Sequence, residues 1–148
     1  MTYGPTAKFD LVAPCGMDCS ACSFYLAFLN GIPKKRGSIC HCTGCRPRNK
    51  QCAYLKGQCE LLAKNEVDFC FECARYPCDR LRKLDQRYRR GYGVSPIENL
   101  EVIRAKGVEF FLRQQCKRHG CPHCGRMISI HNKQCFACDK VQRWKAWR

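Results

Sequence analysis

The sequence has no apolar segment long enough to cross a membrane. A transmembrane helix needs roughly 20 consecutive apolar residues, and no run in these 148 residues approaches that length. Residues 1–14 also lack the apolar stretch of an export signal. We therefore expect a cytoplasmic protein with no membrane partner, in a compartment where thiols stay reduced.

Recognisable catalytic motifs are missing as well. There is no Gly-rich phosphate-binding loop and no H-E-x-x-H metalloprotease motif. Acidic residues are few and scattered, with 12 Asp and Glu against 27 Lys and Arg, and no pair of carboxylates suggests general acid–base chemistry. The sequence leaves enzymatic activity open but favours a non-catalytic protein.

Cysteine, in contrast, is abundant, with 16 residues in the chain. Such a density is typical either of a secreted disulfide scaffold or of an intracellular metal-binding protein. Several cysteines form C-x2-C pairs, the spacing of metal-binding knuckles, and a reducing compartment disfavours disulfides. The sequence therefore predicts metal binding, with about three or four zinc ions per chain.

Two C-x2-C pairs near the C-terminus give the clearest site prediction. Cys121 and Cys124 form the first pair, Cys135 and Cys138 the second, and ten residues separate the pairs. That separation is enough for a short hairpin, with a β segment at residues 127–130, that brings the pairs together. Four thiolates around one ion are the ligands of a structural zinc site and leave no coordination position for a substrate. We therefore predict a zinc ribbon.

The N-terminal region holds eleven further cysteines, and the sequence does not show how they group. The C-x3-C-x2-C spacing of Cys15, Cys19 and Cys22 also occurs around the [4Fe–4S] cluster of radical S-adenosylmethionine enzymes. This chain lacks the length and the alternating strand–helix pattern of their barrel. An iron–sulfur or thiol-redox protein without that barrel stays an alternative, because four-thiolate sites also hold iron–sulfur clusters.

Eleven ligands do not form complete sets of four. Cys116, His41 or His119 would complete one set, and the role of Cys40 is open. A lone cysteine in a helix is often only a small buried apolar residue. The predicted metal ligands of this region are Cys15, Cys19, Cys22, Cys42, Cys45, Cys52, Cys59, Cys70, Cys73 and Cys78.

Apolar patterning and capping residues predict a mostly helical fold. Ser95, Pro96 and Glu98 form a strong helix start, with Ser95 as the cap and Pro96 at the first helical position. Gly107 ends that helix. The predicted helical segments are residues 19–30, 51–67, 77–90, 96–106 and 108–117.

These segments add up to a small, mostly α, metal-stabilised domain with several zinc knuckles and a short β zinc ribbon at its C-terminus. The metal would supply folding energy that a small core cannot. The predicted organisation is a lead-in at 1–14, a Cys-rich helical domain at 15–118, the ribbon at 119–140 and a basic tail with two tryptophans at 141–148.

The chain is strongly basic, with a formal net charge of +15. Three or four zinc–tetrathiolate sites would lower this to about +9 or +7. A basic surface favours RNA, DNA or a ribonucleoprotein as partner, although a solvated helix face or a protein–protein adaptor fits the same residues. The predicted nucleic-acid contacts are Arg87, Arg89, Arg90, Trp144 and Trp147.

Three cysteine motifs also resemble a known family. Residues 15–25 (CGMDCSACSFY), 42–46 (CTGCR) and 70–78 (CFECARYPC) are similar to the signature of a Cys-rich prokaryotic family of uncharacterised proteins, and residues 92–100 and the closing ribbon resemble its longer members. The family is described as a domain of unknown function, presumed zinc-binding. The resemblance covers about residues 12–139 and implies metal binding at the matched cysteines, but no reaction.

Overall fold

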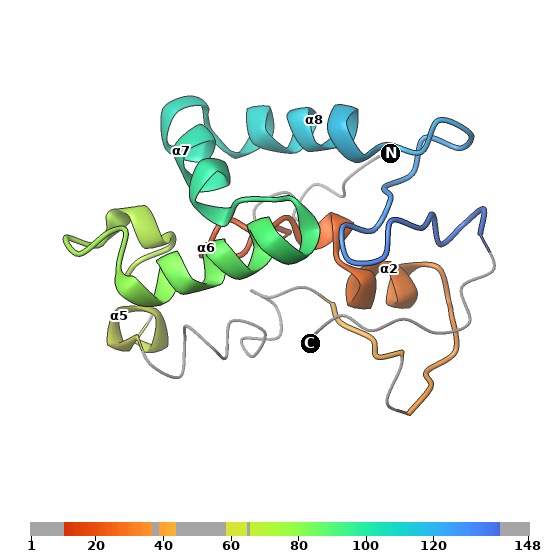
Figure 1. The fold of residues 1–148 in the computed structure, drawn as a ribbon, viewed down its shortest axis with the longest axis horizontal. Helices are drawn as coiled ribbons and strands as arrows, with labels where there is room; N and C mark the ends of the chain where they lie inside the picture. The colour runs from red at the N-terminus through yellow and green to blue at the C-terminus, as the bar shows by residue number, and fades with distance from the viewer. Residues whose placement is uncertain (1–10, 37–38, 44–58, 65, 140–148) are drawn as a thin grey trace.

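The computed structural model describes residues 11–36, 39–43, 59–64 and 66–139, and this part of the chain is largely helical (Figure 1). Within these residues, β structure is limited to isolated bridges. In chain order the helical elements are the 3-10 turn η1 (Cys19–Ala21), α2 (Ser23–Leu29), α5 (Glu60–Ala63), the 3-10 turn η2 (Cys70–Glu72), α6 (Asp79–Tyr92), α7 (Pro96–Lys106) and α8 (Val108–His119).

Helix α7 is the centre of the helical packing, because it contacts α6, α8 and η2. Its start is the one that the sequence predicts: the Ser95 hydroxyl accepts a hydrogen bond from the Glu98 amide, and Pro96 occupies the first turn. Gly107 joins α7 directly to α8, and its φ of 88° is one that only glycine adopts without strain. The two helices therefore turn sharply and stay packed on each other.

A single hydrophobic core runs through the described part of the chain. The largest fully buried side chains include Leu26 of α2, Leu81 of α6, Leu100 of α7 and Phe111 of α8. Met127, from the segment that follows α8, belongs to the same core. The predicted ribbon therefore packs against the helices, and the boundary predicted at residue 118 separates segments that share one core.

The first cysteine motif begins in a tight hairpin. Val12 and Asp18 form an antiparallel bridge, which places Cys15 at the turn between them. Gly16 has a φ of +89°, and a Cβ there would lie 2.5 Å from the carbonyl oxygen of Pro96. The Asn99 side chain donates a 3.0 Å hydrogen bond to the Gly16 carbonyl. The hairpin is thus held against the start of α7.

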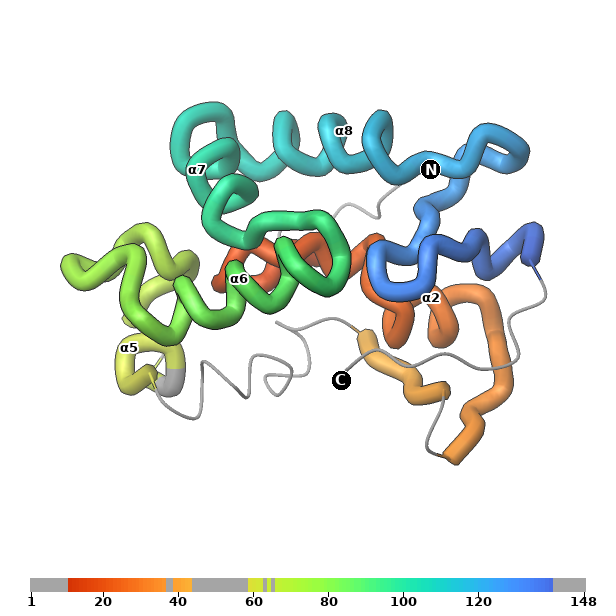
Figure 2. Tube along the Cα trace, viewed as in Figure 1, coloured from red at the N-terminus to blue at the C-terminus, as the bar shows by residue number. Residues whose placement is uncertain are grey.

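The C-terminal segment lies beside α2, as the Cα trace shows in blue and orange (Figure 2). The Ile130 amide donates a 3.0 Å hydrogen bond to the carbonyl of Ala21, and the Ser23 amide donates to Nδ1 of His131 at 3.2 Å. Ser23 and Ser129 also join their buried hydroxyl groups in a hydrogen bond. The hairpin end of the C-terminal segment is therefore attached to the start of α2.

Several predicted element boundaries differ from the structure. The predicted helix 19–30 is divided by Cys22, whose extended backbone separates η1 from α2. The predicted helix at 77 begins two residues later, with Cys78 as its cap. Helix α5 is shorter than the predicted 51–67, of which 51–58 lie outside the described residues. The segments 96–106 and 108–117 are confirmed, the latter extending to His119.

In the described part of the chain, no helix has both the length and the apolar character needed to span a membrane.

Candidate metal centre

The structure gathers the two C-terminal cysteine pairs into one group. The sulfur atoms of Cys121, Cys124, Cys135 and Cys138 all lie within 4.8 Å of one another. The sulfurs of Cys124 and Cys135, one from each pair, lie 3.5 Å apart. The convergence predicted from the spacing is therefore found in the structure.

The same backbone turn positions each pair. The carbonyl of Cys121 accepts a hydrogen bond from the Gly125 amide, and the carbonyl of Cys135 accepts one from the Asp139 amide, both at 2.8 Å. Gly125 has a φ of +74°, which a residue with a side chain rarely adopts. In both pairs the first cysteine is buried and the second is exposed. The group thus lies at the surface with one side against the core.

The segment between the pairs returns the chain without forming strands. A bridge joins Gly120 and Met127, and the Ser129 amide donates to the carbonyl of Gln134 at 3.0 Å. Lys133 completes the turn with a φ of 60°. The predicted β segment at 127–130 is thus reduced to one bridge. The thiols converge because of two knuckle turns and a tight loop rather than a β-ladder.

Hydrogen bonds within the group shift the pKa values of Cys121 and Cys138 in opposite directions. Hydrogen bonds from the backbone amides of Cys124 and His123 lower the pKa of Cys121 to about 7. Hydrogen bonding with Cys124 and Cys135 raises the pKa of Cys138 to about 12. The Cys121 thiol therefore loses its proton readily near neutral pH, whereas the Cys138 thiol keeps its proton. A bound cation would favour the loss of that proton, because metal ligation stabilises the thiolate form.

The ligand set fits a tetrahedral metal ion. Zinc–sulfur bonds of about 2.3 Å put the sulfurs of a four-thiolate site about 3.8 Å apart, and the four sulfurs here lie within 4.8 Å of one another. Four cysteines could hold a metal ion such as zinc, or an iron–sulfur cluster.

The N-terminal cysteines are arranged differently. Cys19 and Cys22 flank η1, and the Cys42 amide donates a 3.2 Å hydrogen bond to the carbonyl of Phe24 in α2. Cys15 lies at the hairpin turn, where the neighbouring Pro14 carbonyl accepts from the amide of Cys70 at 3.0 Å. Within the described residues, these cysteines form no second group as tight as the C-terminal one.

The remaining predicted ligands lie around η2 and α5 or outside the described residues. Cys73 ends η2, Cys78 caps α6 and Cys59 caps α5. Cys45 and Cys52 fall outside the described residues. Of the cysteines left open by the sequence, Cys40 is exposed and Cys116 is half-buried in α8.

Arg89, one of the predicted nucleic-acid contacts, is exposed on α6 but paired with two carboxylates. Its Nε lies 2.6 Å from the carboxylate of buried Asp85, and its guanidinium also pairs with Glu98 at 3.2 Å. Asp85 also accepts hydrogen bonds from the Ser95 hydroxyl and the Ile97 amide. Although burial raises it, these hydrogen bonds and Arg89 hold the pKa of Asp85 below its usual value. Arg89 thus serves the junction of α6 and α7.

Arg87 and Arg90 are exposed on α6, as the sequence predicts, but the full basic stripe is longer. Arg80 and Lys83 are also exposed and precede Arg87 at spacings of seven and four residues. Residues three or four apart share one helix face, so this spacing could have identified them from the sequence. We name Arg80, Lys83, Arg87 and Arg90 the α6 basic stripe. Trp144 and Trp147 lie outside the described residues.

Residues 11–83 match one protein family, described as "Protein of unknown function (DUF3795)". The matched stretch contains the N-terminal cysteine motifs and ends before residues 92–100 and the C-terminal cysteines, which the resemblance had included. The family description names no activity or ligand. The comparisons with curated proteins and with solved structures found no match.

Proposed function

We propose that this protein is a non-catalytic zinc-binding module whose C-terminal cysteines hold one structural zinc ion. One observation carries the proposal: four cysteine sulfurs, delivered by two matching turns, lie within 4.8 Å of one another. Four protein ligands fill a tetrahedral site and leave no position for a substrate. The bound ion would fix the loop between the pairs, and through it the packing of that loop on α2.

The compactness of the group favours zinc over an iron–sulfur cluster. In a cluster, each cysteine binds a different iron or shares one with a second cysteine, so the sulfurs stand around several metal atoms. Around one zinc ion all four sulfurs are neighbours, as they are here. The lowered pKa of Cys121 also provides a first thiolate to which a zinc ion can bind at neutral pH.

Elemental analysis and absorption spectroscopy test this proposal on the full chain, produced with zinc and iron both in adequate supply. We expect a colourless protein that loses one zinc ion when Cys135 is changed to Ser. Cys40→Ser is the matched control, because Cys40 is exposed and outside the group. A brown, iron-bearing protein whose visible absorption disappears in the Cys135→Ser variant would contradict the proposal and show that these cysteines hold an iron–sulfur cluster.

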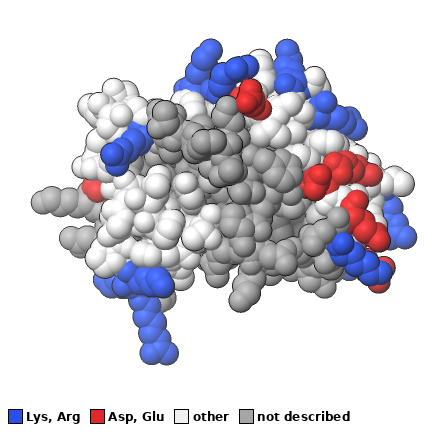
Figure 3. All heavy atoms as spheres, turned by 180° about the vertical axis from the view of Figure 1, so that it is seen from behind, with Lys and Arg blue, Asp and Glu red and all other residues white. Residues whose placement is uncertain are grey.

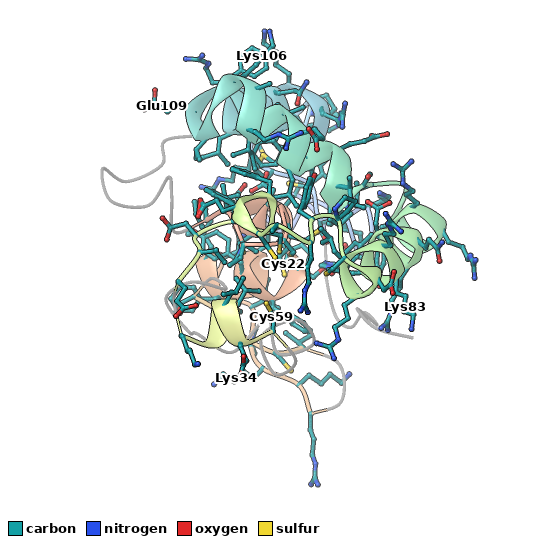
Figure 4. The ribbon with its side chains drawn as sticks, turned by 90° about the vertical axis from the view of Figure 1, so that its left-hand side faces the viewer. Cys22, Lys34, Cys59, Lys83, Lys106 and Glu109 are labelled. Carbon is teal, nitrogen blue, oxygen red and sulfur yellow. The ribbon has the colours of Figure 1, made fainter. Side chains whose placement is uncertain are left out.

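The α6 basic stripe favours a second function, which is contact with nucleic acid. Lys83 projects from α6 away from the body, whereas Lys34 and Lys106 lie at opposite ends of the same view (Figure 4). On the face opposite to that of Figure 1, the Lys and Arg side chains drawn in colour stand at separate places around the edge (Figure 3). Aligned cations along a helix can follow a phosphate backbone, so the stripe is the better candidate for such an interface.

Salt-dependent binding to mixed RNA tests the stripe. The variant Lys83→Ala/Arg87→Ala/Arg90→Ala should lower affinity and flatten the log–log salt slope by about one unit per lost phosphate contact. Arg113→Ala/Lys117→Ala/Arg118→Ala removes the same charge from exposed positions of α8 and should change the slope less. Equal effects of the two variants would mean that RNA binding depends on the net charge of the protein and not on the α6 basic stripe. Negligible RNA affinity at about 150 mM salt, together with a protein partner, would favour the adaptor alternative.

A further inference from the structure

Two large apolar side chains are exposed next to each other at the end of α2. Phe28 and Leu29 are 45% and 49% exposed, and within the described residues they are the large apolar side chains most open to solvent. The preceding residues Leu26 and Ala27 are buried, so α2 packs one face on the core and presents this pair to solvent. An exposed apolar area that is rimmed by charged residues is typical of an interaction site.

The loop that follows α2 is tied back to this end of the helix. The Ile32 amide donates a 2.9 Å hydrogen bond to the Ala27 carbonyl, and His41 donates from Nε2 to the Ile32 carbonyl at 2.6 Å. The rings of His41 and Phe28 also meet edge to face, with their centroids 6.1 Å apart. The loop and the exposed pair on α2 therefore form one surface.

Three consecutive cations belong to the same surface. Lys34, Lys35 and Arg36 are all exposed, and Lys34 lies apart from Lys83 of α6 in Figure 4. Lys35 and Ile39 exchange two backbone hydrogen bonds, of 2.9 and 2.8 Å, which close the turn that carries these cations. None of the ion pairs in the described part of the chain involves the three cations. Their charge is therefore available to a partner.

The charge of this region selects the kind of partner. The sequence has no Asp or Glu between Asp18 and Glu60, so no acidic residue of this segment offsets the cations. A second copy of the chain, with a formal net charge of +15, would be repelled, and the chain's own residues 140–148 are also basic. The surface therefore fits an anionic partner that also presents flat, apolar groups.

We infer that the end of α2 and its loop bind single-stranded RNA, with Phe28 stacking on a base and the three cations contacting phosphates. Unstacked bases in RNA loops and bulges stack on aromatic side chains, whereas a duplex keeps its bases stacked on one another. The α6 basic stripe differs, because neither tyrosine of α6 is exposed and its aligned cations suit a phosphate backbone alone. The two surfaces share only the class of partner, and either proposal can fail without the other.

Photo-crosslinking on the unmodified full chain, with zinc bound, locates the contact. The probe is a short oligouridylate that contains 5-iodouridine, and mass spectrometry identifies the crosslinked residues. We expect a crosslink at Phe28, because stacking places its ring against the photoreactive base. Crosslinks confined to α6, or to Trp144 and Trp147, would overturn the inference and leave the α6 basic stripe in place.

Variants separate the contribution of stacking from that of charge. Phe28→Leu keeps an apolar side chain but removes the ring, and should lower the affinity for the oligouridylate about tenfold with an unchanged salt slope. Lys34→Ala/Lys35→Ala/Arg36→Ala should instead flatten the log–log salt slope by about 0.7 per lost phosphate contact. Leu29→Ala is the matched control, because it changes an equally exposed apolar residue that has no ring, and it should affect the affinity less than Phe28→Leu.

Competing partners are tested with the same variants. The additional probes are duplex RNA and single-stranded DNA of the same length, and vesicles of phosphatidylcholine and phosphatidylserine. Equal affinity for the duplex, tighter binding of the DNA, or equal losses in Leu29→Ala and Phe28→Leu would each overturn the inference. Binding to the vesicles that Phe28→Leu retains, without binding to the oligouridylate, would show a lipid surface as the partner instead. All the substituted side chains are exposed, so the variants leave the core unchanged.

Discussion

The two cysteine regions differ in how the chain delivers their thiols. The C-terminal group comes from 18 consecutive residues, and two hydrogen-bonded turns are enough to bring Cys121, Cys124, Cys135 and Cys138 together. In the N-terminal region, Cys42 lies beside α2 because the loop that carries it bonds back to Phe24. A local group of thiols can form when its own loop folds, while a non-local arrangement depends on the packing of the surrounding helix.

Position in the fold separates the two regions further. The second cysteine of each C-terminal pair is exposed, so solvent and chelators reach that group directly. Cys19 and Cys42 are buried. We therefore expect thiol reagents and chelators to reach the C-terminal cysteines faster than Cys19 and Cys42.

The largest effect should come from removing a C-terminal ligand. Structural zinc contributes on the order of 10 kcal/mol to the folding of small zinc peptides, so Cys135→Ser should abolish the order of residues 121–138. Because Ile130 bonds to Ala21, the start of α2 should loosen as well, while α6 and α7 stay protected. Hydrogen exchange with zinc present measures both effects.

The control for this variant is Cys40→Ser, which should leave the exchange pattern unchanged. Protection lost equally in every helix would show that the metal centre and the helices unfold as one unit. Full protection of residues 121–138 in Cys135→Ser would show that this loop keeps its structure without a bound metal ion.

The hairpin that carries Cys15 offers the next largest effect. In Gly16→Ala, the new Cβ would lie 2.5 Å from the Pro96 carbonyl at a φ of +89°, and we expect a loss of about 3 kcal/mol in unfolding free energy. Gly93→Ala is the matched control, because Gly93 has a φ of +69° with open space around it. That variant should lose about 1 kcal/mol.

Chemical denaturation at saturating zinc compares the two glycine variants. A larger loss at Gly16 than at Gly93 would show that the hairpin, and with it the position of Cys15, is fixed against α7. Equal losses would indicate that the hairpin can move without cost.

The sequence predicted the local features of this molecule and missed the non-local ones. The grouping of the C-terminal cysteines and the Ser95 cap follow from spacing within a few residues, and both are present in the structure. The position of Cys15 could not be read in this way, because it depends on a hairpin held by a distant helix. The pairing of Arg89 with Glu98 was missed for the same reason, since Glu98 belongs to another helix.

Acid should weaken the contact between the two cysteine regions through His131. Burial, followed by the charge of Lys133, lowers the pKa of this imidazole to about 4 in the folded protein, against about 6.5 in the unfolded chain. The unfolded state then binds more protons between these values, so stability falls as the pH drops through this window. From pH 6.5 to 5, the loss assigned to His131 should be about 1.5 kcal/mol.

The variant His131→Asn removes the pH-dependent contribution of His131 to stability, because the asparagine side-chain oxygen can still accept from the Ser23 amide but does not titrate. Denaturation at saturating zinc, at several pH values, should give a shallower pH dependence for the variant. Competition between protons and zinc at the thiols acts on both proteins alike. Parallel curves would mean that His131 is already solvated, and that the contact with α2 is looser than the structure describes.

The smallest expected effect tests most directly whether the two regions form one unit. Ser23 and Ser129 bury their hydroxyl groups completely and bond to each other across the contact. Ser129 Oγ also accepts from the His131 amide at 3.1 Å. Ser129→Ala should therefore cost more than Ser23→Ala, for which we expect about 1 kcal/mol, because it leaves the His131 amide without its acceptor as well as the Ser23 hydroxyl without its partner. The double variant removes both hydroxyls, and its loss of unfolding free energy should be smaller than the sum of the two single losses, with a coupling of about 1 kcal/mol.

Denaturant unfolding at saturating zinc measures the unfolding free energy of the three variants. Additive losses would mean that α2 and the C-terminal segment do not unfold together, and that each cysteine region has its own stability.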